Sequence, residues 1–213
     1  IILGYHGNKI HLNSMFPRIT DAINLLASDY DVELWAMYNI NILGKWKIPE
    51  KKDFLFKVKH IQYSEENYSK YIAYTDIGIV PQIIPFMKNN FLKYISGNLL
   101  KKNNESKHDY FFRFKEDTNP GRHMVFAQYG IPVISDMTPS ACNLINNGVN
   151  GYLAHHSMSW YNYMKILTND QKLREAMGLK FKEKYETIAT AKIQNKNLLN
   201  FIINLKNRHF SKL

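Results

Sequence analysis

The chain has 213 residues and lacks the features that mark several large classes of protein. Its single cysteine, Cys142, excludes an internal disulfide framework and suits a reducing compartment. No apolar run reaches the roughly 18–20 residues that a membrane-spanning helix needs, because Pro81 and Pro85 interrupt the most apolar stretch. Residues 1–4 carry no charge, so we expect no secretory signal and interpret the chain as a piece of a longer protein.

Acidic residues are also scarce relative to basic ones. Lys and Arg number 28 and Asp and Glu 18, so the formal net charge is 28 − 18 = +10, with a pI of about 9.5. This balance favours an anionic partner, which the charge alone leaves open as a phosphate ligand, a nucleic acid or a membrane surface. The composition, with 45% hydrophobic and 22% charged residues, excludes a disordered or collagen-like chain.

Short apolar segments alternate with amphipathic ones along the chain. The pattern predicts strands at residues 1–5, 31–37, 58–62, 76–80, 130–135 and 151–154, and helices at 15–28, 64–74, 119–129 and 138–148, with only helices from Ser157 onward. Such alternation is typical of a parallel sheet covered by helices. We therefore expect one α/β domain over residues 1–213: a Rossmann-like, doubly wound parallel sheet of about six strands, with helices on both faces and a helical C-terminal tail.

Local signals refine where the helices start and where the site lies. Asn119 is expected as an N-cap with Pro120 at the first helical position, and Ser64-Glu65-Glu66 would place acids in a first helical turn. The long irregular segment 82–118 is typical of a functional or mobile loop. In doubly wound sheets, ligands bind beyond the carboxyl ends of the strands, where the strand order reverses. We therefore expect the site at the helix start near Asn119 and in the loops that begin at His6, Gln62, Pro81 and Asp136.

The sequence Asn119-Pro120-Gly121-Arg122 is the most pointed candidate for anion binding. A helix N-terminus offers backbone N–H groups and a partial positive charge, and Gly121 lets a ligand approach the backbone. Arg122 adds a bidentate donor for phosphate. A well-capped helix with a surface arginine is the alternative interpretation of the same residues.

The turn after the first strand is a second candidate. Residues 4–9 lie where mononucleotide folds bind phosphate, so His6 or Lys9 would face a diphosphate beside Gly7. Their spacing is not that of a G-x-G-x-x-G fingerprint, and a turn that merely needs two glycines is the alternative.

The segment before Asn119 mixes charges of both signs. A cation such as Arg113 or Lys115 would share phosphate charge, and a carboxylate such as Glu116 or Asp117 would hold sugar hydroxyls, whereas a solvated loop is the plainer alternative. Residues 110–115 interleave aromatic and basic side chains, a pattern that can stack bases. They lack the glycines of an RNA-binding signature, so nucleic acid is disfavoured as a partner.

Other residues are expected to have structural roles. Cys142 is interpreted as a small buried side chain rather than a nucleophile, and Trp160 with its aromatic neighbours as packing. His6, His11, His155 and His156 show no metal-ligand spacing with cysteine or acidic residues, so no metal is expected. The basic residues of segment 192–212 are expected to be solvated, with contact to an anionic membrane as the alternative.

Residues 113–153 resemble the C-terminal, donor-binding half of GT-B glycosyltransferases, in particular the retaining group 1 family that includes many bacterial polysaccharide enzymes. The matching segments are Arg122, the Gly-Ile-Pro-Val-Ile run at 130–134 and the Gly-Val-Asn-Gly turn at 148–151. Residues 76–81 also look like a strand of these enzymes. The resemblance runs in order from Ile1 to about residue 184.

The resemblance implies metal-independent, retaining transfer of a hexosyl group, without a cofactor, from a nucleotide diphosphate sugar to a polysaccharide, lipid-linked or protein acceptor. By this resemblance Arg122 neutralises the diphosphate of the donor, and Asp117 takes the catalytic position near the first of two acids in the family pattern. The predicted donor-binding residues are His6, Gly7, Lys9, Gln62, Arg113, Lys115, Thr118, Asn119, Gly121, Arg122 and Ser140.

The sequence departs from the family pattern at two acidic positions. The second acid falls on Val125, and the glutamate of the usual Pro-Glu block falls on Asn143. These departures keep open a non-catalytic, Rossmann-like nucleotide-binding or scaffold subunit. GT-B enzymes also have an N-terminal acceptor-binding domain, which this chain is too short to contain. We therefore expect no turnover from the chain alone, and a cytoplasmic location with peripheral contact to the inner face of a membrane as an option.

Overall fold

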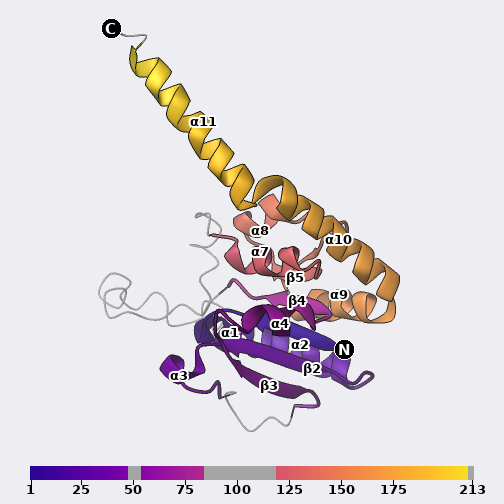
Figure 1. The fold of residues 1–213 in the computed structure, drawn as a ribbon. Coiled ribbons are helices and arrows are strands. Elements are labelled where there is room, and N and C mark those ends of the chain that lie inside the picture. Colours follow the sequence, from indigo (N-terminus) through magenta and orange to yellow (C-terminus); the bar gives the residue numbers. More distant parts are fainter. Residues whose placement is uncertain (48–53, 84–118, 211–213) are drawn as a thin grey trace, which may run out of the picture.

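The computed structural model describes residues 1–47, 54–83 and 119–210. Within these ranges six strands form one parallel sheet in the order β3-β2-β1-β4-β5-β6 (Figure 1). The strands are β1 (Ile2–His6), β2 (Glu33–Tyr38), β3 (Lys57–Gln62), β4 (Ile77–Val80), β5 (Val133–Asp136) and β6 (Tyr152–Ala154). Each strand predicted from the sequence is confirmed, with shifts of at most three residues at its ends.

The strand order reverses between β1 and β4. The chain first builds outward from β1 to β3, then returns beside β1 and builds outward to β6. Gly4 and Gly78 are paired across the two central strands. A Cβ at Gly4 would lie 2.7 Å from the Thr75 side chain, and one at Gly78 would lie 2.7 Å from the ring of Phe126. The two glycines therefore allow neighbouring elements to pack directly on the centre of the sheet.

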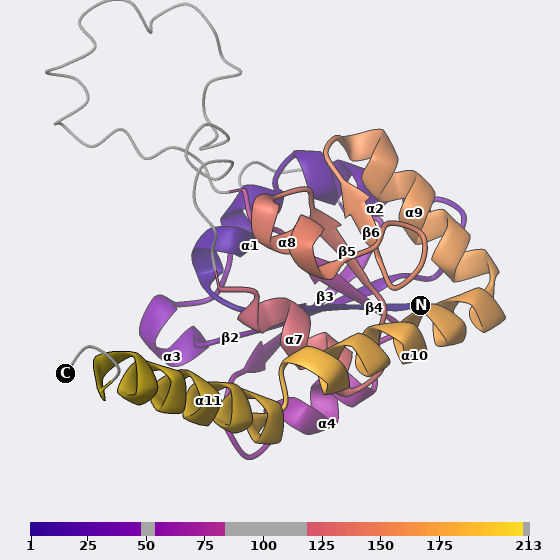
Figure 2. The ribbon, with the colours of Figure 1, turned by 90° about the horizontal axis from the view of Figure 1, so that it is seen from above.

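Helices cover both faces of the sheet, as the sequence predicts. One apolar cluster joins the sheet to α1 (Lys9–Met15), α2 (Arg18–Ala27) and α9 (Ser157–Asn169), and a second joins it to α4 (Tyr68–Ala73), α7 (Gly121–Gln128) and α8 (Pro139–Leu144). Helix α10 (Gln171–Ile188) contacts both α7 and α9. Figure 2 shows α2 and α9 on one side of the strands and α4, α7 and α10 on the other.

The predicted helix over residues 15–28 is wrong in its extent. The chain forms two helices there, α1 and α2, which are separated by Phe16 and Pro17. Proline has no N–H to donate and clashes with the preceding turn, so it does not continue α1. Helix α1 occupies residues that were expected as a loop, and it buries Leu12 and Met15 against the core.

Two further helix boundaries differ from the prediction. Helix α4 begins at Tyr68, and Ser64-Glu65-Glu66 precede it in turns, so no acid lies in its first turn. Helix α8 ends at Leu144 rather than near Gly148. The Asn150 side chain causes this early end, because it accepts a hydrogen bond from the Asn146 N–H at 2.7 Å and donates to the Leu144 carbonyl.

Helix α7 starts one residue later than predicted. Pro120 is the N-cap and Gly121 the first helical residue. The side chain of Asn119 still provides the cap, because its Oδ1 accepts a hydrogen bond from the Gly121 N–H at 2.9 Å. The capping chemistry is therefore as expected, although the register differs.

Cys142 is exposed, so its predicted burial is wrong. Ala141 and Leu144 supply the buried face of the short helix α8, which leaves Cys142 on the outer side. Trp160, in contrast, is fully buried, and the neighbouring Tyr163 stacks on Tyr152 with ring centroids 4.3 Å apart. These aromatic side chains therefore pack against the domain itself, as expected.

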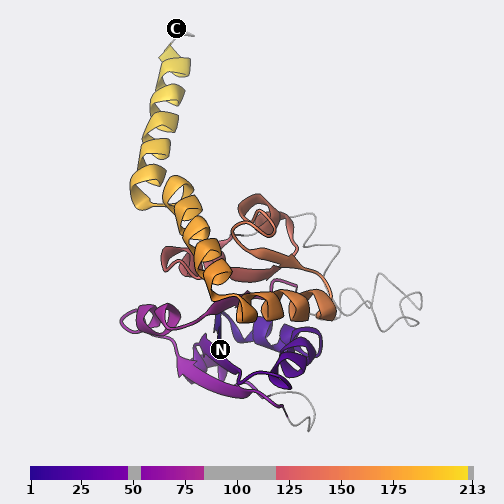
Figure 3. The same ribbon diagram turned by 90° about the vertical axis from the view of Figure 1, so that its right-hand side faces the viewer.

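The last described element is a long helix that projects from the domain. Helix α11 (Ala191–Phe210) follows α10 and stands away from the body, as Figure 3 shows from the side. A short helix, α3 (Ile40–Leu43), lies after β2. Among the described helices, none combines the length and apolar character needed to cross a membrane.

Candidate functional site

Arg122 lies at the carboxyl edge of the sheet, where the strand order reverses. Its Nη1 donates a hydrogen bond of 2.5 Å to the carbonyl of Pro81, directly after β4. A Cβ at Gly7, directly after β1, would lie 2.9 Å from Arg122 Cδ. Gly7 also has a φ of 152°, a backbone conformation that residues with a Cβ rarely adopt. The start of α7 and the loops after β1 and β4 therefore meet at one place, as the sequence analysis expects.

The end of β1 places an aromatic group beside Arg122. The His6 ring lies 5.5 Å from the Tyr63 ring and 6.1 Å from the Tyr68 ring, measured between centroids. Burial, together with the positive charge of Arg122, lowers the pKa of His6 below its usual value. His6 is therefore neutral at physiological pH. Its buried Nδ1 has no hydrogen-bond partner among the described residues.

The side chain of Tyr5 stabilises the carboxyl end of β1. It is fully buried, and its hydroxyl donates to the Asn8 carbonyl at 2.6 Å. Burial raises the pKa of Tyr5 well above its usual value, with the Arg122 charge acting in the opposite direction. The side chain of Asn8 caps α1 by accepting from the Ile10 N–H. The turn between β1 and α1 is thus held by its own hydrogen bonds.

Lys9 and Gln62 have structural partners. The Lys9 ammonium donates to the Leu43 carbonyl at 2.7 Å, at the end of α3. The Gln62 amide accepts from the Asn41 N–H at 3.0 Å and donates to the Tyr63 carbonyl at 2.9 Å. Both side chains therefore hold α3 against the carboxyl edge of the sheet.

Ser140 belongs to a buried polar network beyond β5. The Thr138 hydroxyl donates to the Gln82 side-chain oxygen, and the Gln82 amide donates to Ser140 Oγ at 3.4 Å. All three residues are buried. The network links the start of α8 to the segment that leaves β4, so Ser140 lies on the same edge of the sheet as Arg122.

A buried ion pair, which no sequence pattern predicted, holds the same segment. The Asp136 carboxylate pairs with Arg18 at 2.6 Å and accepts hydrogen bonds from the Gln82 and Ile83 N–H groups at 2.8 and 3.0 Å. Asp136 was predicted only as the start of a loop. An acidic residue at the end of an otherwise apolar strand is the signal that indicates such a buried partner.

His123 anchors the start of α7 to the sheet and was also missed. It is fully buried, and its Nε2 lies 2.8 Å from Ser135 Oγ on β5. Burial, aided by the charge of Arg122, lowers the pKa of His123 to about 3. The ring is therefore neutral, and it fixes the helix turn that carries Arg122.

The remaining predicted site residues fall into two groups. Asn119 and Gly121 lie together at the start of α7, where the Asn119 side chain accepts a hydrogen bond from the Gly121 N–H. Arg113, Lys115, Asp117 and Thr118 lie outside the described residues. Within the described ranges, no cluster of three or more His, Cys, Asp or Glu side chains has the arrangement of a metal site.

No protein-family model and no curated protein sequence matches the chain. Its fold, however, is similar to that of several solved structures. One is the C-terminal domain of the glycosyl transferase group 1 family protein LpcC from Francisella tularensis, with 12% identity, a TM-score of 0.58, and coverage of 89% of this chain and 86% of that one. At this identity the likeness shows the fold alone.

Two larger proteins contain a similar domain. HepE from Anabaena, solved in complex with UDP and glucose, has 14% identity and a TM-score of 0.60, and the match covers 95% of this chain and 48% of HepE. TarM from S. aureus, solved in a complex that includes UDP, has 10% identity and a TM-score of 0.57, with 93% and 34% coverage. The chain thus spans most of the LpcC domain and half or less of HepE and TarM. The expected fold, a Rossmann-like parallel sheet covered by helices, is confirmed, and it is similar to that of the LpcC C-terminal domain.

Proposed function

We propose that the chain is the donor-binding domain of a glycosyltransferase and binds a nucleotide diphosphate sugar. The observation that carries this proposal is the position of Arg122, which lies between the ends of β1 and β4 at the reversal of strand order. This is where doubly wound folds bind nucleotides. The presence of UDP in the complexes of HepE and TarM supports the same ligand class.

The chemistry of sugar transfer asks for stabilisation of the leaving diphosphate. When the bond from the anomeric carbon to the donor oxygen breaks, negative charge grows on the terminal phosphate. A preorganised guanidinium at that place stabilises the charge, and its planar fork can bind two phosphate oxygens. Arg122 is held by the Pro81 carbonyl and by the packing of α7, so little reorganisation is needed.

Residues around Arg122, some predicted and some found only in the structure, complete the proposal. The aromatic group of His6, Tyr63 and Tyr68 flanks Arg122 and offers ring faces and a neutral imidazole to the nucleoside or sugar. Gly7 lets the Arg122 side chain lie directly against the turn after β1. Asp117 as the catalytic residue, and Arg113, Lys115 and Thr118 as donor ligands, stay predictions. We also propose a retaining, metal-independent reaction and a polysaccharide, lipid-linked or protein acceptor.

The acceptor-binding domain would lie outside this chain. The chain matches 48% of HepE and 34% of TarM, which leaves room in those proteins for a second domain. We therefore propose that turnover needs an N-terminal domain, on the same or another chain, and that the 213 residues bind the donor without transferring sugar.

A non-catalytic nucleotide-binding module is the second candidate. Val125, which stands where the family pattern has its second acid, packs against the apolar cluster beside α7. Lys9 and Gln62 both form hydrogen bonds with backbone groups of α3. Fusion to an acceptor-binding domain separates the two candidates, because only a catalytic donor domain gains turnover.

Titration calorimetry with UDP, GDP, ADP, dTDP and CMP tests the proposed site. Replacing Arg122 by Ala should weaken binding of the preferred diphosphate about 10- to 100-fold, since a hydrogen bond to a charged group contributes about 1.5–3 kcal/mol. Arg208→Ala is the matched control, because it removes the same charge from α11. Arg122→Lys keeps the charge without the fork and should give an intermediate affinity.

Two results would contradict the proposal. One is equal affinity of wild type and Arg122→Ala for the preferred diphosphate, with circular dichroism showing both to be folded. The other is an equal loss in Arg208→Ala, which would indicate a general charge effect rather than a site at the carboxyl edge of the sheet.

A further inference from the structure

The peptide group between Pro81 and Gln82, directly after β4, is held from both sides. Its carbonyl, that of Pro81, accepts a hydrogen bond from Arg122 Nη1 at 2.5 Å. Its N–H, that of Gln82, donates to Asp136 Oδ2 at 2.8 Å. A peptide group is planar, so the direction of its N–H fixes the direction of its carbonyl. The carboxylate of Asp136 therefore sets the orientation of the acceptor to which Arg122 bonds.

The Asp136 side chain extends the pairing of β4 and β5 beyond the point where the backbone pairing stops. Backbone groups pair the two strands as far as Val80. In a parallel pair every second N–H of a strand faces the same neighbour, and the Gly78 N–H bonds to the carbonyl directly before β5. The Gln82 N–H falls on that side again and bonds to the Asp136 carboxylate. The same oxygen, Oδ2, accepts from the Ile83 N–H at 3.0 Å, so it fixes two consecutive peptide groups.

Arg18 holds the Asp136 carboxylate in place. Asp136 is completely buried, and Arg18 Nη1 lies 2.6 Å from its other oxygen, Oδ1. Burial of a carboxylate is costly unless the group is paired and hydrogen-bonded. The guanidinium and the two backbone N–H groups meet these needs at different oxygens. A rotation of the carboxylate would therefore break both sets of contacts at once.

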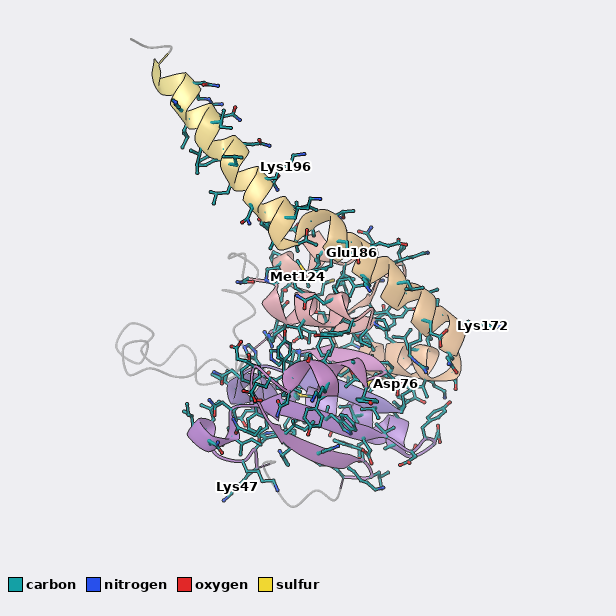
Figure 4. The ribbon with its side chains drawn as sticks, viewed as in Figure 1. Lys47, Asp76, Met124, Lys172, Glu186 and Lys196 are labelled. Atoms are coloured by element: carbon teal, nitrogen blue, oxygen red, sulfur yellow. The ribbon has the colours of Figure 1, made fainter. Side chains whose placement is uncertain are left out.

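The preceding residue of β5, Ser135, fixes the donor of the same hydrogen bond. Ser135 Oγ lies 2.8 Å from His123 Nε2, and both side chains are fully buried. His123 follows Arg122 directly in the first turn of α7, where Figure 4 labels the next residue, Met124. Two neighbouring residues of one strand, Ser135 and Asp136, thus hold the helix turn that carries the donor and the peptide group that carries the acceptor.

We propose that Asp136 is a positioning residue for Arg122. This role rests on the proposed function, in which the Arg122 guanidinium binds the diphosphate of the donor. Asp136 orients the Pro81 carbonyl, and that carbonyl orients the guanidinium. A guanidinium has five N–H donors in a fixed fork, so one bond through Nη1 sets the plane of the whole group. The fork is then ordered before the diphosphate arrives, which lowers the entropy cost of binding.

Two double variants separate the acceptor from the buried charge. Both carry Arg18→Met, so that no arginine is left buried without its carboxylate. Asp136→Asn in this background keeps an oxygen that can accept from the two N–H groups. Asp136→Leu has nearly the same shape and offers no acceptor. The two chains therefore differ in the acceptor and not in net charge.

Nucleotide affinity is measured by titration calorimetry, with whichever of UDP, GDP, ADP or dTDP binds the wild type most tightly as the probe. The leucine variant should bind this diphosphate about 3- to 10-fold more weakly than the asparagine variant, because its Arg122 side chain must be ordered on binding. The asparagine variant should retain the affinity of the wild type within about twofold, since it keeps the acceptor. Circular dichroism checks that both variants are folded.

The same pair of variants with Arg122→Ala shows whether Asp136 acts through Arg122. Without the guanidinium, the asparagine and leucine variants should bind the diphosphate equally, because the two positions are then uncoupled. A role in stability alone would lower the melting temperature of the leucine variant and leave the affinities of the folded variants equal in both backgrounds.

Nuclear magnetic resonance of the chain without nucleotide gives a second measurement. In the wild type, the Gln82 and Ile83 amide protons should exchange slowly with solvent, and the Arg122 guanidinium protons should give resolved signals. In the leucine variant the two amides should exchange at least tenfold faster than in the asparagine variant, and the Arg122 signals should broaden. The wild-type spectrum tests the arrangement even where the leucine variant does not fold.

Three results would overturn the role of Asp136. They are fast exchange of the Gln82 and Ile83 amides in the wild type, equal affinity of the two double variants while Arg122→Ala weakens binding, and the same ratio of their affinities with and without Arg122. An Arg122→Ala variant that binds as tightly as the wild type would instead contradict the proposed donor site. The Arg122 signals then still decide whether Asp136 orients this side chain.

Discussion

Helices α10 and α11 follow each other in the chain and differ in what covers them. Helix α10 has 18 residues and buries Met177, Gly178 and Phe181 against the domain, whereas α11 has 20 residues and buries none of its apolar side chains from Gln194 to Arg208. Both carry apolar and basic residues. The comparison shows that the composition of a helix does not decide whether the helix packs on the domain. Packing depends on whether another surface of the domain lies against the apolar side of the helix.

The largest difference should appear when the same substitution is made in the two helices. Phe181 is fully buried between α10 and the cluster around α7, so Phe181→Ala should lower the free energy of unfolding by about 3–5 kcal/mol. Phe201→Ala on α11 should change it by less than about 0.5 kcal/mol, because that ring is exposed. Urea unfolding followed by circular dichroism measures both values. Similar losses in the two variants would show that α11 packs on the body in solution.

A smaller effect is expected where α10 contacts the turn that precedes β5. A Cβ at Gly178 would lie 1.9 Å from the carbonyl oxygen of Gly130 and 3.1 Å from Pro132 Cδ. Because the nearest atom belongs to the backbone, Gly178→Ala must shift the helix, at a cost toward the upper end of about 1–3 kcal/mol. The exposed Asn200→Ala on α11 is the control, with an expected change below about 0.5 kcal/mol. An unchanged melting temperature for Gly178→Ala would contradict this contact.

The stability of the packed body should also depend on pH through His123. The pKa of His123 is about 3 in the folded chain and near 6.5 in an unfolded one. Between about pH 3 and pH 6.5 the imidazole is therefore protonated in the unfolded state and neutral in the folded state. The neutral ring therefore contributes stability that is present above pH 6.5 and is lost as the pH falls. Between pH 7 and pH 5 the loss should be about 2 kcal/mol, at about 1.4 kcal/mol per pH unit.

Comparison with His123→Gln isolates this contribution, because the amide does not titrate and all other groups stay in place. Urea unfolding at pH 7 and pH 5 should show a decrease in stability that is about 2 kcal/mol larger for the wild type than for the variant. Parallel pH dependences would mean that His123 is protonated, or accessible to water, in the folded state.

Much of the fold could be predicted from the sequence, because strands and helices are local patterns. The apolar runs that became β2 and β5 needed only their own residues to be identified. Helix ends were less predictable. Helix α8 stops at Leu144 because the side chain of Asn150 bonds back to that turn, and α4 starts late, after turns that contain Glu65. These ends depend on bonds that a local pattern does not contain.

The candidate site was predictable in outline, and its partners were not. Arg122 is a predictable candidate because an arginine in the first turn of a capped helix can donate to an anion, and its role as a donor ligand stays a prediction. That it bonds to the Pro81 carbonyl follows only when β4 lies beside β1. Lys9 and Gln62, which are predicted at the donor, bond to α3, and Asp136 pairs with Arg18 in the core.

The sequence by itself determined the alternation of strands and helices, the parallel α/β class and the excess of cations, because periodicity and charge are properties of short segments. Only the tertiary structure decided which side chains meet. The order of the strands brings Gly7, Pro81 and Arg122 together, buries Asp136 and leaves Cys142 outside. It also covers α10 and leaves α11 exposed, because a helix is buried only where another surface lies against its apolar side.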